Sequence, residues 1–350
     1  MIQRLMGVFF GVLAVMHASS LMYVSSFSNN EVLQYSGFTG AAVNDPFATY
    51  GSGGLKDPTG LAFGPDGNLY VASWWNNTIL KFNGSTGAYI STLVSGSSLL
   101  ADPTGLVFGP DGNLYVASQS NGDVLEYNPT TGAYIQQFAT GLSNPYGLAF
   151  DSAGNLYVAN YFAGNVLEYY GPNASPGHVP GTLEATFASG LSYPYDLAFD
   201  RSGNLWVSSF GTNSSNSEVV EYSSSGTLSR IIGVTTPTGL AIGPDGNVYV
   251  ASATGNDVLE YSDSDGSLIK TFVGSGSAGL SNPSFLIVDT TPEPGTFFLA
   301  GTLLAVFALR FRARRRSGRP YSGNGCPLVS GANGKAARPT RNTRHMVTPA

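Results

Sequence analysis

The chain has 350 residues, of which only 11% are charged, whereas Gly (45), Pro (20), Tyr (19) and Phe (20) are abundant. This composition predicts many short strands joined by tight turns, and low charge with 42% hydrophobic residues argues against a disordered chain. All 22 acidic residues but only five of the 16 basic ones lie between residues 21 and 294, so this part would repel phosphate backbones and nucleic-acid binding is not expected.

The N-terminus has the pattern of a secretory signal. Arg4 is followed by an apolar run from Leu5 to Met16 and then by the small residues Ala18 and Ser20. One basic residue, a short apolar stretch and small residues at a cleavage point are typical of signal peptides. We therefore expect residues 1–20 to be removed during export.

One pattern recurs through the body of the chain. It reads Pro-x-Gly-Leu-Ala-Phe, then a turn, then Gly-Asn-Leu-Tyr-Val-Ala-Ser, and its copies begin at Pro58, Pro103, Pro145, Pro194, Pro237 and, truncated, Pro283. Repeats of roughly 40–45 residues that hold several strands each are typical of β-propeller blades. The turn, for example Gly64–Asn68, has Pro and Asp at its corners, and we expect its Asp to be a turn former.

Each repeat predicts four strands, which in one unit are Leu61–Phe63, Asn68–Ala72, Thr78–Phe82 and Ala88–Leu93. The first two are apolar on both faces, which predicts that they are covered on both sides by neighbouring blades. The third strand alternates, as in Val124-Leu125-Glu126-Tyr127, so we expect one of its faces to meet water.

The two ends of the body complete the ring. Leu21–Ser26 matches the second strand of a blade and Glu31–Tyr35 the third, but no first strand precedes them. The missing strand is found at the far end, in Phe285–Val288, where it would close the first blade and leave no open sheet edge. The sequence therefore predicts an all-β fold, a six-bladed β-propeller of four-stranded blades over residues 21–290, closed by its C-terminal strand.

Residues 291–316 read as a membrane-directed tail. Pro292, Glu293 and Pro294 precede an apolar run that ends at Leu309, and the arginines that follow are Arg310, Arg312, Arg314, Arg315 and Arg316. The run is slightly shorter than the about 20 residues that span a bilayer, and we expect one hydrophobic helix with its arginine end in the cytoplasm. Residues 317–350 are basic, polar and glycine-rich, which predicts disorder.

Two family resemblances follow from these motifs. The repeat resembles NHL repeats and the related gluconolactonase-like propellers over residues 21–289. Residues 291–316 resemble the PEP-CTERM sorting signal of Gram-negative bacteria, in which an exosortase is thought to process the tail during export. These resemblances imply an exported bacterial protein, anchored at least transiently in the membrane by its C-terminal helix, with an exosortase as a partner.

The gluconolactonase-like resemblance also implies where a metal would lie. Members hold a metal over the central channel with Asn, Asp and Glu, and several ligands fall at the x of Pro-x-Gly, which here is Thr59, Thr104, Tyr146, Tyr195, Thr238 or Ser284. Uncharged hydroxyls would bind a hard cation weakly, so we assign no metal and no cofactor. Asp196 is the one carboxylate nearby, and we expect a solvated or capped surface group there.

Other catalytic sets cannot be assembled from the body. His178 is its one histidine, whereas a zinc site takes three or four protein ligands and a Ser-His-Asp or Cys-His set needs a base. The single cysteine, Cys326, lies in the tail. We assign no catalytic residue.

The loops between second and third strands are rich in aromatic residues. We expect these loops to reach the face on which the Pro-x-Gly segments begin, where the candidate ligand-binding residues are Phe27, Trp74, Trp75, Tyr146, Tyr161, Phe162, Tyr195 and Phe210. Flat rings among neutral hydrogen-bonding groups suit a sugar, and the alternative is that the rings seal joints between blades.

The sequence favours a non-enzymatic binding or scaffold propeller of the cell envelope or extracellular matrix, which presents this face to an extracellular polysaccharide or to an envelope protein. The alternative is a lactonase- or lyase-type propeller hydrolase with a non-standard metal site, which only the likeness of fold suggests.

Overall fold

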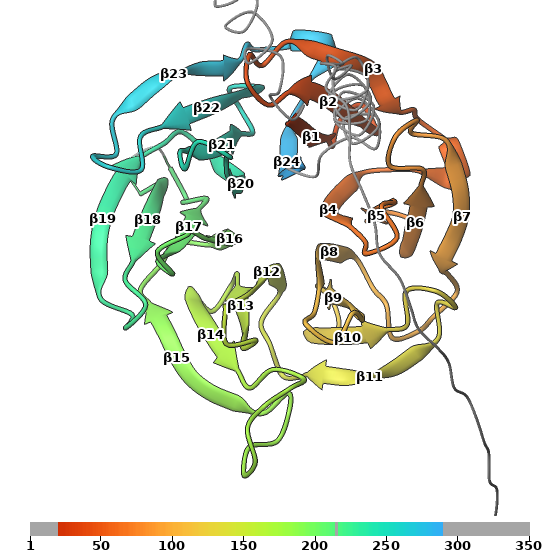
Figure 1. Cartoon of the computed structure of the whole chain (residues 1–350), viewed down its shortest axis with the longest axis vertical. Helices are drawn as coiled ribbons and strands as arrows, with labels where there is room; N and C mark the ends of the chain where they lie inside the picture. The colour runs from red at the N-terminus through yellow and green to blue at the C-terminus, as the bar shows by residue number, and fades with distance from the viewer. Residues whose placement is uncertain (1–19, 214–215, 290–350) are drawn as a thin grey trace, which may run out of the picture. The chain divides into compact units, whose positions relative to one another are not determined.

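Six four-stranded antiparallel sheets surround a central opening in the computed structural model (Figure 1), which describes residues 20–213 and 216–289. All of these residues belong to one compact unit. The prediction of a six-bladed, four-stranded propeller is therefore confirmed.

Each blade begins with an inner strand at the opening and ends with an outer strand at the rim (Figure 1). Blade 1 contains β24 (Pro283–Asp289), β1 (Leu21–Ser26), β2 (Glu31–Ser36) and β3 (Ala42–Ala48). Blade 2 contains β4 (Pro58–Phe63), β5 (Leu69–Ser73), β6 (Thr78–Phe82) and β7 (Tyr89–Val94). Blade 3 contains β8 (Pro103–Phe108), β9 (Leu114–Ser118), β10 (Asp123–Tyr127) and β11 (Tyr134–Ala139). Blade 4 contains β12 (Pro145–Phe150), β13 (Leu156–Asn160), β14 (Asn165–Tyr169) and β15 (Leu183–Ser189). Blade 5 contains β16 (Pro194–Phe199), β17 (Leu205–Ser209), β18 (Glu218–Tyr222) and β19 (Leu228–Gly233). Blade 6 contains β20 (Pro237–Ile242), β21 (Val248–Ser252), β22 (Asp257–Tyr261) and β23 (Leu268–Val273).

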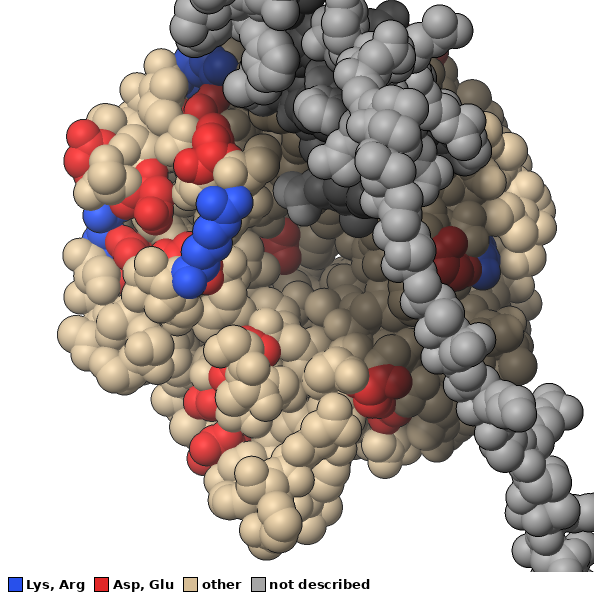
Figure 2. Space-filling model, viewed as in Figure 1, with Lys and Arg blue, Asp and Glu red and all other residues tan. Residues whose placement is uncertain are grey.

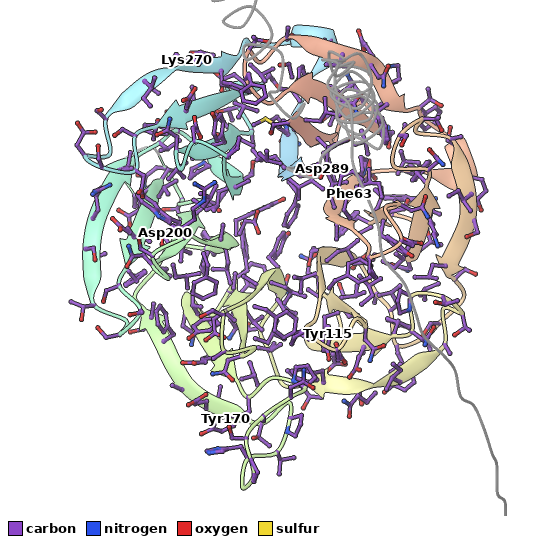
Figure 3. The ribbon with its side chains drawn as sticks, viewed as in Figure 1. Phe63, Tyr115, Tyr170, Asp200, Lys270 and Asp289 are labelled. Carbon is purple, nitrogen blue, oxygen red and sulfur yellow. The ribbon has the colours of Figure 1, made fainter. Side chains whose placement is uncertain are left out.

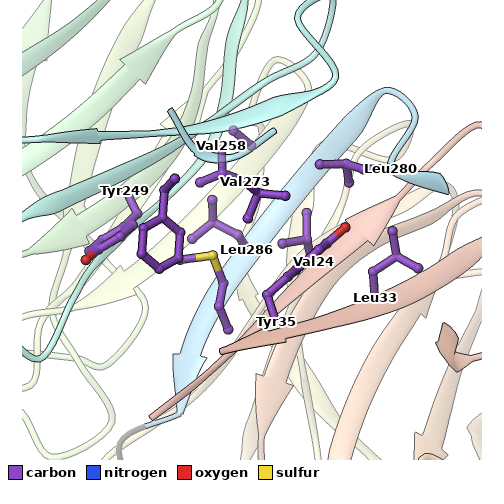
Figure 4. Close-up of a cluster of buried hydrophobic side chains, with 11 residues drawn as sticks. Val24, Leu33, Tyr35, Tyr249, Val258, Val273, Leu280 and Leu286 are labelled. Carbon is purple, nitrogen blue, oxygen red and sulfur yellow. The ribbon is translucent and has the colours of Figure 1, made fainter. Parts of the chain in front are cut away.

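The C-terminal strand closes the first blade, as expected. β24 pairs antiparallel with β1, with Met22 opposite Val288 and Val24 opposite Leu286. The joint between blades 6 and 1 is filled by a buried cluster that includes Leu286, Tyr249 and Val258 (Figure 4). This cluster therefore draws on residues from both ends of the body.

The glycine of Pro-x-Gly is required by the close approach of neighbouring inner strands. A Cβ at Gly60 would lie 2.1 Å from the carbonyl oxygen of Thr104, and one at Gly105 would lie 2.3 Å from that of Tyr146. Real side chains do not tolerate such contacts with backbone, so the inner strands can meet this closely only where the Cβ is absent. The motif thus specifies the narrow part of the central channel.

Three of the third strands, β10, β18 and β22, differ from the prediction that one face meets water, because their glutamates are buried, whereas Glu168 in β14 is partly exposed. Glu126 in β10 is only 4% exposed, because the outer strand covers it. Its carboxylate accepts hydrogen bonds from Asn113 Nδ2 at 2.7 Å and from Gln136 Nε2 at 2.7 Å. Alternation of polar and apolar residues therefore marks a buried, paired carboxylate here rather than a solvated face.

The turn aspartates behave as expected. Asp66 Oδ1 accepts the backbone N–H of Asn68 at 3.1 Å, and the equivalent bonds at Asp111 and Asp245 are 3.1 and 3.2 Å long. The carboxylate also accepts from the second-strand tyrosine hydroxyl, as from Tyr115 to Asp111 Oδ2 at 3.1 Å. Each turn is thereby tied to the core of its blade.

Several expectations fall on residues that the structure does not describe. They are the signal segment up to residue 19, the sorting motif and hydrophobic helix at 291–316, and the tail at 317–350. Within residues 20–213 and 216–289 no helix has the length and apolar character that crossing a bilayer requires.

Candidate functional site

A narrow cavity of about 240 Å³ lies where the inner strands begin. The six residues at the x of Pro-x-Gly all line it: Thr59, Thr104, Tyr146, Tyr195, Thr238 and Ser284. The loops that follow the second strands add Phe27, Trp74, Tyr161, Phe210 and Ala253, and the segment before β24 adds Asn282 and Pro283. The expectation that these loops return to the Pro-x-Gly face is confirmed.

Four of the six x residues hold neighbouring blades together through their hydroxyls. Thr59 Oγ1 donates to the carbonyl of Pro103 at 2.8 Å, and Thr104 Oγ1 donates to that of Pro145 at 2.9 Å. Thr238 bonds Pro283 at 2.7 Å in the same way. Because each proton is committed to a backbone carbonyl, the hydroxyl oxygens keep lone pairs that can accept from a ligand.

The other two x residues are tyrosines, and they belong to a continuous aromatic surface. Tyr146 and Tyr161 stack with ring centroids 4.7 Å apart, and Tyr161 stacks in turn on Tyr193 at 4.9 Å. Tyr146 also packs against Tyr195 at 4.7 Å, and Tyr195 against Phe210 at 6.3 Å. The rings of blades 4 and 5 therefore form one wall of the narrow cavity.

A chain of side-chain hydrogen bonds links this wall to blades 2 and 3. Trp74 Nε1 donates to Gln119 Oε1 at 2.8 Å, and Gln119 Nε2 donates to Tyr146 OH at 3.1 Å and to Asn144 Oδ1 at 2.8 Å. Tyr146 OH thus accepts a bond and keeps its own proton for a further partner. The network holds the Trp74 and Tyr146 side chains in place in the absence of a ligand.

The narrow cavity is electrically neutral. None of the side chains that line it is a carboxylate, an ammonium, a guanidinium or an imidazole, within the part of the chain that the structure describes. Burial, with the nearby tyrosine and carboxylate groups, raises the pKa of both Tyr146 and Tyr195 above the ordinary value. These hydroxyls therefore stay protonated at neutral pH, and the cavity offers uncharged donors and acceptors.

Six of the eight aromatic residues expected on this face line the narrow cavity, and two lie outside it. Trp75 is 59% exposed, with Lys56 Nζ 4.1 Å from its ring centroid, and Phe162 is 61% exposed. Sequence reasoning missed Tyr193 and Gln119. Tyr193 directly precedes the Pro-Tyr-Asp segment and adopts a positive φ of 59°, and Gln119 follows β9 in a loop with no aromatic residue to mark it.

A second, wider cavity of about 520 Å³ lies where the inner strands end. Its walls are formed by the Leu-Ala-Phe parts of these strands, and Figure 3 shows Phe63 and Asp289 beside the central opening. The third position of Pro-x-Gly separates the two cavities, because the x residues line the narrow one while Gly105, Asp196 and Phe285 line the wide one.

The expectation that Asp196 is a surface group in contact with solvent is wrong. Asp196 is only 7% exposed, and it occupies the position of the Pro-x-Gly glycine, at the level where neighbouring inner strands meet. Asp196 Oδ1 accepts the N–H of Leu197 at 2.9 Å and Oδ2 accepts that of Leu240, in the next blade, at 3.0 Å. Burial outweighs these two bonds and raises the pKa of the carboxyl to about 7.

The residues at the narrow cavity do not fit the metal that gluconolactonase-like propellers imply. The x hydroxyls donate to carbonyls, and Asp196 faces the wide cavity and is held by two amides. A cluster of three carboxylates, from Asp200, Glu221 and Asp263, lies elsewhere, between blades 5 and 6. Arg230 lies beside this cluster, with its Nε 3.6 Å from Glu221 Oε2.

His178 packs its ring on Tyr170, with ring centroids 4.2 Å apart, in the loop between β14 and β15 that extends outward from blade 4 (Figure 3).

Comparison with solved structures shows the same fold. A chain of the structure described as the nidogen/laminin complex has a TM-score of 0.61 at 17% identity, and the match covers 77% of this chain and 98% of that one. A protein of unknown function from Bacteroides caccae has a TM-score of 0.59 at 15% identity, covering 77% and 99%.

A virginiamycin B lyase from Staphylococcus aureus is a more distant match, with a TM-score of 0.49 at 15% identity. No family model and no curated protein matches the sequence. Likeness at this level establishes the propeller fold, and the function has to be argued from the site.

Proposed function

We propose that this chain is a non-enzymatic binding propeller that takes a neutral sugar ring, the end or a branch of an extracellular glycan, into the narrow cavity. The observation that carries the proposal is the wall of stacked rings from Tyr161, Tyr146 and Tyr195, which faces a ring of uncharged hydroxyls. An aromatic face covers the apolar C–H face of a sugar, while hydroxyl oxygens and protons meet its polar edge.

The size of the cavity favours a sugar ring over a protein partner. At about 240 Å³ it is smaller than the roughly 300–1,000 Å³ of most small-molecule sites. One ring fits, whereas a stable protein interface needs a surface of about 800 Å² on each partner. The absence of charge among the lining residues favours a neutral sugar over a uronic acid or a sulfated one.

The two ends of the sequence support an extracellular setting for this activity. Residues 1–20 have the pattern of a signal peptide, and residues 291–316 resemble the PEP-CTERM signal that an exosortase processes. The repeat resembles NHL propellers. We infer that the chain is exported and reaches the cell envelope or matrix, where an extracellular polysaccharide would be accessible to it.

A panel of immobilised glycans, probed with the purified full chain, tests the proposal. We expect retention on neutral glycans, and loss of that retention in Tyr161→Leu but not in Phe162→Leu, the adjacent ring that lies outside the cavity. Retention only on charged glycans, or on none, would overturn the proposal, and specific capture of an envelope protein through the same residues would replace the glycan with a protein ligand.

A further inference from the structure

The wide cavity at the other end of the axis combines apolar walls with one carboxyl group. Its lining residues are Gly105, the Leu-Ala-Phe parts of the inner strands and their equivalents in β24, and Asp196. Asp196 is the one ionisable residue among them, within the described chain. Its volume, about 520 Å³, lies within the range of small-molecule sites.

Asp196 is held in a fixed position at the level where the channel narrows. Its two oxygens accept one backbone N–H each, from Leu197 and Leu240, and its own N–H donates to Ser208 Oγ at 2.9 Å. A carboxylate has about four lone-pair sites, so two remain on a group that lines the cavity. The acceptor geometry is therefore set before a ligand binds.

The rim of the wide cavity is acidic. The turns that follow the inner strands carry Asp66, Asp111, Asp151, Asp200 and Asp245, directly after the residues that form the cavity wall. Lys81 pairs with Asp66 at 2.6 Å and Arg201 bonds the carbonyl of Pro244, so two cations offset part of this charge. Figure 2 shows acidic side chains on the blades that surround the central opening. The rim favours the approach of a cation over that of an anion.

From this arrangement we propose that the wide cavity is a second ligand site, which takes an apolar primary amine with its ammonium group on Asp196 and its hydrocarbon part along the Leu-Ala-Phe walls. A neutral apolar ligand would leave the carboxylate in a dry site with its two amide hydrogen bonds but without an opposite charge, which is costly. An ammonium group supplies both the opposite charge and three donors.

The length of the site limits the ligand. Phe199 lies three residue steps beyond Asp196 on β16, which at about 3.3 Å per residue places the rim of the cavity about 10 Å from Asp196. A chain of about six carbons reaches from Asp196 to the rim, so hexylamine is a suitable probe. 1-Hexanol is its matched control, because it has the same apolar part and no charge.

Protonation of Asp196 should compete with the amine. Burial raises the pKa of this carboxyl to about 7, so the ionised form that pairs with an ammonium group is lost as the pH falls below that value. The groups packed against the carboxyl are Gly147 of β12, Ser208 of β17 and Leu240 of β20, none of which is charged. The adjacent Tyr195 has its pKa raised by burial and stays neutral over the same range.

Calorimetric titration of the purified full chain with each probe tests the site. We expect hexylamine to bind at pH 8 at least about tenfold more tightly than 1-hexanol, a difference of about 1.4 kcal/mol, and to lose that advantage at pH 5.5. Asp196→Asn should reduce hexylamine affinity to that of the alcohol. Ile242→Trp, which narrows the wide cavity without touching Asp196, should weaken both probes.

Equal affinity of the two probes at pH 8 would overturn the proposal, as would the absence of hexylamine binding at concentrations up to about 10 mM. If Asp196→Asn does not fold, the pH comparison on the unmodified chain and the Ile242→Trp variant decide. Loss of hexylamine binding in Tyr161→Leu with retention in Ile242→Trp would place the amine in the narrow cavity and so reject this site. None of these results depends on glycan binding.

Discussion

The hydroxyl of Ser284 donates a hydrogen bond of 2.9 Å to the backbone carbonyl of Pro58, 226 residues away in the sequence. It joins the last strand of the ring, β24, to the first inner strand of the next blade, β4. The bonds from Thr59 to Pro103 and from Thr104 to Pro145 repeat it between later blades. Four of the residues that line the narrow cavity thus also hold the inner strands of neighbouring blades together.

Leu286→Ala tests whether closure by β24 stabilises the whole ring. Leu286 is 2% exposed and packs in the cluster between blades 6 and 1. Removing a buried leucine side chain costs about 2–5 kcal/mol, so we expect the urea midpoint of the full chain to fall accordingly in a single transition.

Leu268→Ala is the matched control, because Leu268 on the outer strand β23 is exposed and its truncation should change stability by less than about 0.5 kcal/mol. Equal effects of the two substitutions would show that β24 does not contribute to the core.

Gly105→Ala tests the close approach of the inner strands. The added methyl group would lie 2.3 Å from the carbonyl oxygen of Tyr146, and the backbone of β8 would have to move. Overpacking of this kind costs typically about 1–3 kcal/mol, which thermal unfolding would detect. Gly274→Ala, where the new group meets open space, should leave the melting temperature almost unchanged, and a comparable loss there would point to backbone entropy instead.

Asp196→Asn should alter the dependence of stability on pH. The folded protein keeps this proton up to about pH 7, whereas an unfolded chain releases it near pH 4, so the contribution of Asp196 is fully present below pH 4 and is lost as the pH rises to 7. The stability of the unmodified chain relative to Asp196→Asn should therefore fall by up to roughly 4 kcal/mol between pH 4 and pH 7 and stay level above that. Denaturant titrations of both proteins at several pH values measure this difference, and a gap independent of pH would show that the carboxyl titrates normally.

The fold could be predicted from the sequence because each blade repeats the same local chemistry. The apolar second strand recurs in every repeat, the glycine of Pro-x-Gly in four of the six and the Gly-Pro-Asp-Gly turn in three, and each specifies a backbone or packing requirement. The closing strand was predictable because Leu21–Ser26 lacked an inner partner that Pro283–Asp289 supplies. The burial of the third strands was not predictable. Alternation of polar and apolar residues does not distinguish a carboxylate in water from a buried one such as Glu126, which accepts a hydrogen bond from Asn113.

The candidate site was predictable only in part. Neighbouring positions in different repeats placed Tyr146, Tyr195 and Tyr161 at one end of the axis, and they line one cavity. The sequence could not show that Trp75 and Phe162 point away from it, since two adjacent loop residues carry no periodicity. The burial of Asp196 was also not predicted. The sequence did contain an indication of it, because Asp196 occupies the position at which other blades have a glycine with no room for a Cβ.

The most direct test of glycan binding in the narrow cavity compares two adjacent rings. Tyr161 stacks between Tyr146 and Tyr193 inside the cavity, whereas Phe162 is exposed outside it. Titration of the full chain with a neutral oligosaccharide selected on the glycan panel should show affinity reduced by about tenfold or more in Tyr161→Leu, because this ring supports the Tyr146 ring in the cavity wall and its loss would let that wall move, and unchanged affinity in Phe162→Leu. Unaltered affinity in Tyr161→Leu, with that protein folded as judged by its melting temperature, would contradict the proposed site.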